Sequence, residues 1–427
     1  MVLPPEGVDR DIDVIKALLL LHSRRWTGSR PQVVAAVHDS ENLAAAQLAA
    51  GGEALVIDAE DIAVRLIAQA HRQTGLSAVF NELLSFVGNE FYFHEEPALV
   101  GSTYGLALNA FDLGIPVGLR VRAGDVLVNP PMETVIGPGD QILVVAEDDL
   151  LIRLREARPA IAESAITSAP AQSPTLDRTI LIGENSRTAK LVTLLDSFVQ
   201  PGSTLDIAAP RQPEAIPSDA LVNLTVGFKV CEPTRRSSLE ALDLGGYQHI
   251  VVLSDDTVAP GPADDRTLVT LLHLRDIEES LGDPYSIVTE MNDDGNREVA
   301  QVTKADDFIV STKVISLLLT QLTENRHLHA VFTDLFNPEG SEIYLKPASN
   351  YVIPGAEANF ATVIEAARRR RETALGYRLA DHDEEPPTYG IFLNPSRSAP
   401  LVFGSKDAVV VFAEGETAAV SGDGLSR

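Results

Sequence analysis

The chain contains one unit twice. The tripeptide Ala78-Val79-Phe80 reappears as Ala330-Val331-Phe332, a shift of 252 residues from Phe80 to Phe332. Three more residues recur at the same shift: Gly88 as Gly340, Glu90 as Glu342 and Tyr92 as Tyr344. Self-similarity at so long a period indicates a pair of domains rather than a solenoid of short motifs. The fold must therefore accommodate two related halves.

The match extends in both directions from this segment. Upstream, Asp11 aligns with Asp264 and Gln69 with Gln321. Downstream, residues 127–130 correspond to 392–395 and residues 140–147 to 407–414, with short insertions between them. The repeat thus covers most of the chain.

Composition limits the class of protein and its partners. The chain has 427 residues, 45% apolar and 22% charged, as in an ordinary globular protein. Its net charge of −27 disfavours nucleic acid and anionic lipid, which carry the same sign, and favours cations or basic surfaces. The single cysteine, Cys231, fits a reducing, cytoplasmic setting and a buried structural thiol. No window approaches the ~20 apolar residues that span a bilayer.

Strands and helices alternate in the second copy. Strands are predicted at residues 178–183, 204–208, 222–226, 249–254 and 286–290, and helices at 186–198 and 264–280. This order predicts an α/β fold with a doubly wound parallel sheet. After Ser311, a helix to about residue 335 and strands at 341–346, 376–379, 390–393 and 408–413 predict a smaller α+β lobe. The expected architecture is two tandem Rossmann-like domains, each followed by a small α+β lobe.

The first copy begins late in this pattern. Met1-Val2-Leu3 aligns with Val251-Val252-Leu253, so the first half of the first sheet has no counterpart. A sheet without those strands would expose edges and apolar faces. We therefore expect the first Rossmann-like domain to be truncated, and the chain to be a fragment or separated from an upstream segment.

These observations predict six segments. They are the C-terminal half of a first Rossmann-like domain (1–77), a first small lobe (78–155), a linker rich in Ala, Pro and Ser (156–177), a second Rossmann-like domain (178–312), a second small lobe (313–415) and a flexible tail (416–427). A further loop is predicted at 381–387, where a solvated acidic loop is favoured over a metal site.

A nucleotide would bind at the turn after the first strand of the intact sheet. That turn runs from Gly183 to Thr188 and has one glycine where the dinucleotide fingerprint has three. The next strand does not end in the acidic residue that holds a ribose, which disfavours ordinary NAD binding. The candidate cofactor-binding residues are Gly183, Asn185 and Arg187, with a helix-start salt bridge as the favoured alternative for Arg187.

Acidic pairs follow several strands of the same sheet. Hard cations such as Ca²⁺ need several oxygen ligands, and the carboxyl edge of a doubly wound sheet is where ligands bind. For any single pair, stabilisation of a helix N-terminus is the favoured alternative. The candidate metal ligands are Asp255, Asp256, Asp264, Asp265, Asp293 and Asp294.

The sequence offers no support for an enzyme. It contains no nucleophile motif, metalloprotease helix or paired zinc-ligand spacing, and two neighbouring histidines, His327 and His329, would point in different directions on a helix. The basic run at residues 368–371 ends a predicted helix, where positive charge is stabilising. It is expected to be solvated or to meet carboxylates of a neighbouring subunit.

Taken together, these residues resemble the cytosolic part of the Castor/Pollux ion channels. The resemblance lies in residues 75–92, 115–118, 127–130 and 139–149 of the first copy, and in residues 180–183, 195–196, 201–203, 271–277, 368–372 and 376–380 of the second. It covers almost the whole chain except the linker.

The resemblance implies a function. In that family, a potassium-channel-type pore precedes two tandem domains that regulate potassium conductance, and four subunits form a gating ring at the inner face of a membrane. Ligand binding to the ring, with Ca²⁺ implicated for the plant members, biases the pore. The chain is expected to act as a homo-oligomeric regulatory segment of a cation channel. Two alternatives stay open: a stand-alone, nucleotide-binding peripheral subunit of a potassium transporter, and a degenerate dehydrogenase.

Overall fold

The computed structural model describes residues 1–2, 10–73, 75–168, 176–213, 216–282, 285–296, 299, 307–337, 340–382 and 388–414. It divides into two compact units that each combine parts of both copies. The large-lobe unit comprises Met1–Arg72 and Thr175–His329, and the small-lobe unit comprises Gln73–Pro174 and Ala330–Arg427. The predicted boundary after residue 77 lies near the division after Arg72. The predicted boundary after residue 312 lies well before the division after His329, because helix 311–324 belongs with the large lobes. The predicted tail and most of the acidic loop at 381–387 lie outside the described residues.

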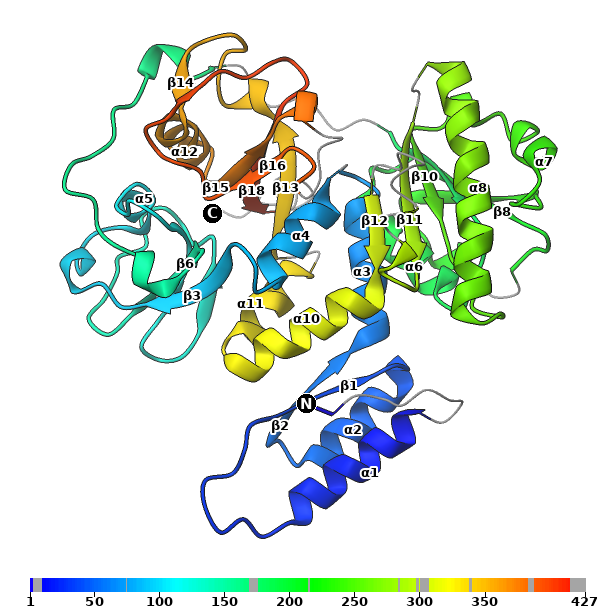
Figure 1. The fold of residues 1–427 in the computed structure, drawn as a ribbon, viewed down its shortest axis with the longest axis horizontal. Helices are drawn as coiled ribbons and strands as arrows, with labels where there is room; N and C mark the ends of the chain where they lie inside the picture. The colour runs from blue at the N-terminus through cyan, green and yellow to red at the C-terminus, as the bar shows by residue number, and fades with distance from the viewer. Residues whose placement is uncertain are drawn as a thin grey trace, which may run out of the picture. The chain divides into compact units, whose positions relative to one another are not determined.

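The second copy supplies the main sheet of the large-lobe unit. All six strands are parallel, in the order β12-β11-β10-β7-β8-β9, which is the Rossmann arrangement with its switch point between β7 and β10. The elements are β7 (Arg178–Ile182), α6 (Thr188–Phe198), β8 (Ser203–Ala209), β9 (Leu224–Val230), α7 (Arg236–Glu240), β10 (His249–Val252), α8 (Pro260–Leu281), β11 (Ser286–Met291), β12 (Asp307–Val310) and α10 (Ser311–Glu324) (Figure 1). The doubly wound prediction is confirmed for this copy.

The first copy contributes the matching part of a second sheet. Its elements are α1 (Arg10–Ser23), β1 (Val33–Val37), α2 (Leu43–Ala50), β2 (Ala54–Asp58) and α3 (Ala59–Ala70). Strand β1 pairs in parallel with β2, and Val2 forms a parallel bridge with Ala35. In the second copy Val252, the equivalent of Val2, pairs with Thr289, the equivalent of Ala35. Val2 therefore lies where the sequence alignment predicts.

Within the large-lobe unit, one helix of each copy packs against strands of the other copy. Helix α3 of the first copy packs against β11 and β12 of the second, while α10 of the second packs against β1 and α3 of the first. The equivalent glutamines, Gln69 and Gln321, are both buried in these two helices. Each copy thus covers a face of the other copy's sheet, and apolar burial of this kind is the main driving force for folding.

The small-lobe unit contains two sheets of identical topology. The first copy has the order β3-β6-β4-β5 and the second β13-β18-β15-β16, all antiparallel. The elements are α4 (Leu76–Leu84), β3 (Glu90–His94), α5 (Tyr104–Ala107), β4 (Ile115–Arg120), β5 (Val126–Val128), β6 (Gln141–Ala146), α11 (Leu328–Leu335), β13 (Ser341–Pro347), β14 (Ala358–Asn359), α12 (Phe360–Arg369), β15 (Thr373–Arg378), β16 (Ile391–Leu393), β17 (Pro400–Leu401) and β18 (Ala408–Glu414). The duplication is therefore visible in three dimensions.

The long helix predicted after Ser311 is two helices. Helix α10 ends at Glu324, because Asn325 adopts an extended backbone and its side-chain oxygen accepts a hydrogen bond from the amide of His327. Asparagine favours such local hydrogen bonds over continued helix. The prediction of one helix to residue 335 is therefore wrong.

Equivalent irregularities recur in both small sheets. The register shifts between Pro116 and Gly118 in one, and between Ala374 and Gly376 in the other. A Cβ atom on either glycine would collide with a carbonyl oxygen of the neighbouring strand, Leu127 O or Phe392 O. These glycines allow β5 and β16 to approach on the side opposite the shifted pairing.

Aromatic side chains join the two small lobes reciprocally. Phe80 of α4 stacks on Phe336 at a centroid distance of 5.3 Å, and Phe332 of α11 meets Phe91 edge-on at 6.0 Å. Phe80 and Phe332 are equivalent residues of the repeat. The repeated Ala-Val-Phe tripeptide thus marks a shared core.

The basic run at 368–371 is partly neutralised within its own chain. Arg368 donates two hydrogen bonds to Glu365, both at 2.8 Å, and Arg369 pairs with Glu163 and Glu365 at 2.8 Å. These two arginines therefore already have carboxylate partners in the small-lobe unit.

Two equivalent asparagines also link the small lobes. Asn129 and Asn394 both have positive φ, at 45° and 48°. The side chain of Asn129 accepts a hydrogen bond from the Thr373 hydroxyl at 2.8 Å, and that of Asn394 accepts one from the Gly114 amide at 3.0 Å. Each asparagine reaches into the other copy, so one motif is used twice across the interface.

Asn129→Ala is expected to lower the free energy of unfolding by about 1–3 kcal/mol, because the buried Thr373 hydroxyl keeps only the Tyr104 hydroxyl as a hydrogen-bond partner and alanine is strained at positive φ. Asn129→Gly removes the same hydrogen bond without the strain and should recover ~1 kcal/mol of that loss. Urea unfolding of both variants checks this. Equal stability of the two variants would contradict the role of backbone conformation.

A buried histidine gives the large-lobe unit a pH dependence. His71 follows α3, is 1% exposed and lies edge-on to His249 at a ring distance of 5.3 Å. Burial, and to a lesser extent the neighbouring His249, lowers the pKa of His71 to about 3. The folded state therefore holds this ring neutral, whereas the unfolded chain protonates it near its ordinary pKa of 6.5.

A lowered histidine pKa means that stability is full above about pH 6.5 and falls as the pH drops toward 3, by up to ~1.4 kcal/mol per pH unit. His71→Leu should therefore show a shallower loss of unfolding free energy between pH 7.5 and 5.5 than the parent chain. Urea titrations at several pH values measure both slopes. Since His249 is retained in the variant, parallel slopes would show that His71 is not the linked group.

Candidate functional site

The candidate site lies at the carboxyl edge of the six-stranded sheet. The turn after β7 carries Gly183, Asn185 and Arg187, the loop after β10 carries Asp255 and Asp256, and β11 contributes Glu290. Strands β7 and β10 are neighbours at the switch point, where a doubly wound sheet opens a crevice. The structure thus brings the predicted nucleotide-binding residues and Asp256 together.

Gly183 holds the turn in a shape that only glycine tolerates. Its φ is 89°, and a Cβ atom would lie 2.9 Å from the carbonyl oxygen of Leu253. Its amide donates to Ala208 O at 2.9 Å. This glycine therefore fixes the close approach between the turn and the end of β10.

A buried carboxylate occupies the centre of the site. Glu290 is 2% exposed, and its carboxylate forms an ion pair with Arg187 at 2.5 Å. It also accepts hydrogen bonds from the side-chain amide of Asn185 at 3.0 Å and from the amide of Ser254 at 3.3 Å. Burial raises the pKa of Glu290, and the charge of Arg187 and these hydrogen bonds oppose that rise. Arg187 and Asn185 are thus engaged by a residue of their own chain.

A second carboxylate occupies the place of a phosphate. One oxygen of Asp256 accepts hydrogen bonds from the amide of Ser186 at 2.9 Å and from its hydroxyl at 2.6 Å. Ser186 lies just before α6, and a helix N-terminus is where a phosphate would bind. A pyrophosphate would therefore have to displace Asp256 and approach the buried Glu290.

Sequence reasoning identified Arg187 but missed Glu290 as its partner, because long-range pairing leaves no local pattern.

Asp264 is occupied by a structural role. It is fully buried near the start of α8 and accepts hydrogen bonds from the amides of Asn292 and Asp293 at 2.9 and 3.0 Å. The side-chain amides of Asn292 and Asn296 donate to it at 3.0 and 2.8 Å. This carboxylate ties α8 to the loop after β11.

The first copy contains the same arrangement. Asp11 is buried in α1 and accepts hydrogen bonds from the amides of His38 and Asp39, both at 2.8 Å, and from the side chain of Asn42 at 3.1 Å. His38, Asp39 and Asn42 are the repeat equivalents of Asn292, Asp293 and Asn296. Both copies use this carboxylate to order a loop. This structural role is sufficient to explain why the aspartate occurs in both copies of the repeat.

The other predicted metal ligands are dispersed. Asp255 accepts from Thr257 and pairs with Arg266 at 2.8 Å, and Asp294 pairs with Lys313 at 2.7 Å. Asp265 and Asp293 are exposed, and Asp293 accepts from the amide of Gly295 at 2.9 Å. Among the described residues, no three His, Cys, Asp or Glu side chains gather in a way that could hold a metal ion. The calcium site therefore stays a prediction.

Comparisons with known proteins agree with this architecture. The structure of the human SLO3 gating ring covers 96% of this chain, and the chain covers 85% of it, with a TM-score of 0.64 and 12% identity. The chain therefore shares the fold of that structure, with tandem Rossmann-like domains. A structure titled GsuK channel bound to NAD covers 98% of the chain with a TM-score of only 0.38.

The predicted resemblance to the Castor/Pollux ion channels is confirmed. The family model described as Castor and Pollux, part of voltage-gated ion channel, matches residues 60–162. The probable ion channel POLLUX of Oryza sativa subsp. japonica is 27% identical over 90% of this chain and 43% of its own length. The ion channel CASTOR of Lotus japonicus is 26% identical over 91% of this chain and 50% of its own length. The chain spans about half the length of the curated relatives it matches.

The relatives named here are ion channels rather than enzymes. In the part of the chain that the structure describes, no helix is long and apolar enough to cross a membrane.

Asp264→Ala in EDTA is expected to lower the free energy of unfolding by about 2–4 kcal/mol, because four N–H donors lose their buried, charged acceptor. Asp11→Ala should have a similar effect, since its role is the same. Chemical unfolding without metal measures both. If Asp264→Ala lowered stability only when Ca²⁺ was present, the carboxylate would be a metal ligand instead.

Proposed function

We propose that this chain is the ligand-sensing gating-ring segment of a Castor/Pollux-like cation channel. It would regulate potassium or calcium conduction through a pore formed by residues outside this chain. The observation that carries the proposal is the gating-ring fold built from two paired copies in one polypeptide. Similarity to named ion channels over 90% of the chain supports it.

The proposed assembly is a homo-oligomeric ring, with four subunits expected from the resemblance, at the cytoplasmic face of a membrane. Pairing of the two copies within one chain supports this, because one subunit then contributes two related regulatory domains. The net charge of −27 favours attraction of cations toward such a ring.

The mechanism is a shift of population. A ligand that binds one ring shape more tightly than another contributes that difference in affinity to pore opening. The carboxyl edge of the six-stranded sheet is the proposed sensing site, because its loops come from β7, β10 and β11 and are tied together by Glu290, Asp256 and Asp264. A ligand that replaced one of these hydrogen-bonded or ionic contacts would change the arrangement of the loops relative to one another.

A cation is the proposed effector of this edge, with the exposed carboxylates of Asp265 and Asp293 as the first groups available to it. The other carboxylates already have partners: Asp255 pairs with Arg266, Asp256 accepts from Ser186 and Asp294 pairs with Lys313. These contacts would have to break before the carboxylates could bind a cation. Cation binding would therefore be coupled to rearrangement of the loops. The nucleotide-binding transporter subunit is the less supported alternative, because Asp256 accepts hydrogen bonds from Ser186 where a phosphate would bind and a phosphate there would approach the buried Glu290.

The purified chain is expected to unfold at a higher temperature as Ca²⁺ is titrated against EDTA, since a ligand that binds only the folded state stabilises it. Mg²⁺, ATP and NADH are titrated separately, and Asp265→Asn/Asp293→Asn is compared with the parent chain. The double variant should lose most of the Ca²⁺ shift while keeping its stability in EDTA.

A stabilising shift with ATP or NADH alone would contradict the cation proposal and favour the transporter subunit. No shift with any of these ligands would remove this edge as the sensing site. An unchanged Ca²⁺ shift in the double variant would move the cation away from Asp265 and Asp293.

A further inference from the structure

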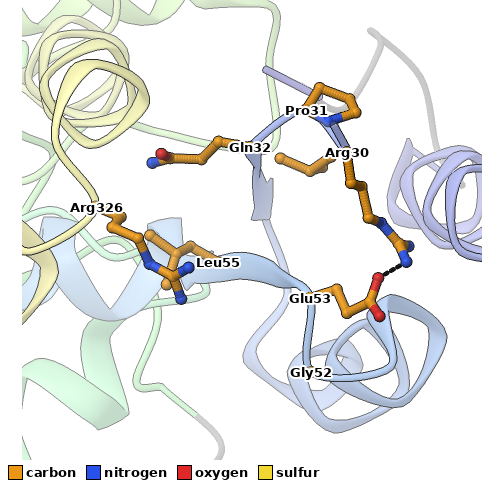
Figure 2. Close-up of a pocket in the computed structure, with 8 residues that line it drawn as sticks. Arg30, Pro31, Gln32, Gly52, Glu53, Leu55 and Arg326 are labelled. Carbon is orange, nitrogen blue, oxygen red and sulfur yellow. Dashed lines mark ion pairs between the residues drawn. The ribbon is translucent and has the colours of Figure 1, made fainter. Parts of the chain in front are cut away.

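A polar pocket lies away from the carboxyl edge, in the first copy's part of the large-lobe unit. Its volume is about 440 Å³, within the range of small-molecule sites. Figure 2 shows its lining, which comes from the start of β1 and the segment before it, from β2 and the turn before it, and from the turn after α10. The lining residues are Arg30, Pro31, Gln32, Val33, Gly52, Glu53, Leu55 and Arg326.

The pocket contains two guanidinium groups and one carboxylate. Arg30 forms an ion pair with Glu53 on one side of the pocket (Figure 2). Arg326 lies on the other side, and within the described part of the chain no hydrogen bond or ion pair engages its guanidinium. On a chain of net charge −27, a pocket with an excess positive charge is unusual and selects for anions.

The walls of the pocket are held in place by hydrogen bonds. The side-chain amide of Gln32 donates to Leu322 O at 2.6 Å, which ties the start of β1 to α10. Arg326 follows Asn325, whose side chain and carbonyl accept from His327 and Leu328 and so order the turn. Arg326 is therefore presented on an ordered turn rather than on a free loop.

We propose that this pocket binds a small oxyanion, a phosphate or carboxylate group, through Arg326. A guanidinium presents paired N–H donors that match such a group in a bidentate manner. Arg30 supplies a second cationic wall whose charge Glu53 offsets. The site is independent of the sensing edge proposed above, because none of its lining residues belongs to that edge.

The pocket also has a mechanical consequence. Its wall joins β1 of the first copy to the turn between α10 and α11 of the second. An anion bound by Arg326 against the segment before β1 would therefore add a connection between the two copies inside the large-lobe unit. Such a ligand would stabilise the packing of α10 on β1.

The test titrates the full chain with inorganic phosphate and, separately, with acetate, using chloride of equal ionic strength as the reference. The unfolding temperature should rise with at least one of the two anions beyond the chloride reference. Arg326→Gln should weaken that binding by about tenfold or more, the usual loss for a charge-assisted hydrogen bond. Glu53→Gln should strengthen it, because Arg30 is then released toward the pocket.

The matched control is Arg235→Gln, which removes the same charge from an exposed arginine near α7 in the same unit. It should bind the anions as the parent chain does. Because Arg326 is exposed, Arg326→Gln should keep the parental unfolding temperature in chloride, and this separates lost binding from lost folding. A response to phosphate but not acetate would identify a phosphate-bearing ligand, and the reverse a carboxylate.

An equal anion response in Arg326→Gln and the parent chain would overturn the proposal, as would the absence of any response to both anions. Because the sensing edge is tested with cations and with different variants, failure of this site leaves that result unaffected.

Discussion

Each copy of the repeat buries its apolar faces against the other copy, and this reciprocal packing is the constraint on which the structure depends. Helix α3 covers strands of the second copy's sheet, while α10 packs against β1 of the first. In the small lobes, Phe80 of the first copy packs against Phe336 of the second, and Phe332 of the second packs against Phe91 of the first. Each copy has a core cluster of its own, and part of the layer that covers its sheet comes from the other copy. Because of this coupling, a change in one copy alters the packing of the other.

Buried polar groups determine the relative arrangement in which the two copies pack. Asp11 and Asp264 each order a loop through several N–H donors, and Asn129 and Asn394 each reach across to the other small lobe. A buried acceptor without its donors is expensive, so these contacts favour a single arrangement. At the switch point the same principle places the buried Glu290 against Arg187, while the exposed Asp256 accepts hydrogen bonds from Ser186. The site is consequently occupied by the chain's own carboxylates, in contrast to an open dinucleotide crevice.

Much of the fold could be predicted from the sequence because its determinants are local or repeated. The alternation of apolar runs predicted the parallel sheet, and the shift between copies predicted that Val2 would lie where it does beside Ala35. The boundary of α10 was missed because one asparagine, Asn325, outweighs the apolar periodicity around it. At the site, the single glycine at Gly183 indicated a departure from the dinucleotide fingerprint. The acidic pairs suggested a shared cation site because the sequence places them at one edge without specifying their donors.

By itself, the sequence determined that the protein is a duplicated α/β chain, that its glycine turn lacks two of the three fingerprint glycines and that its charge is strongly acidic. Periodicity, spacing and composition are properties of neighbouring or aligned residues, and a sequence displays them directly. Only the tertiary structure decided that Asp264 orders a loop, that Glu290 holds Arg187 and that Arg326 faces a pocket with Arg30. These outcomes depend on distances between residues far apart in the chain, and hydrogen-bond partners and burial are defined only once the chain has folded.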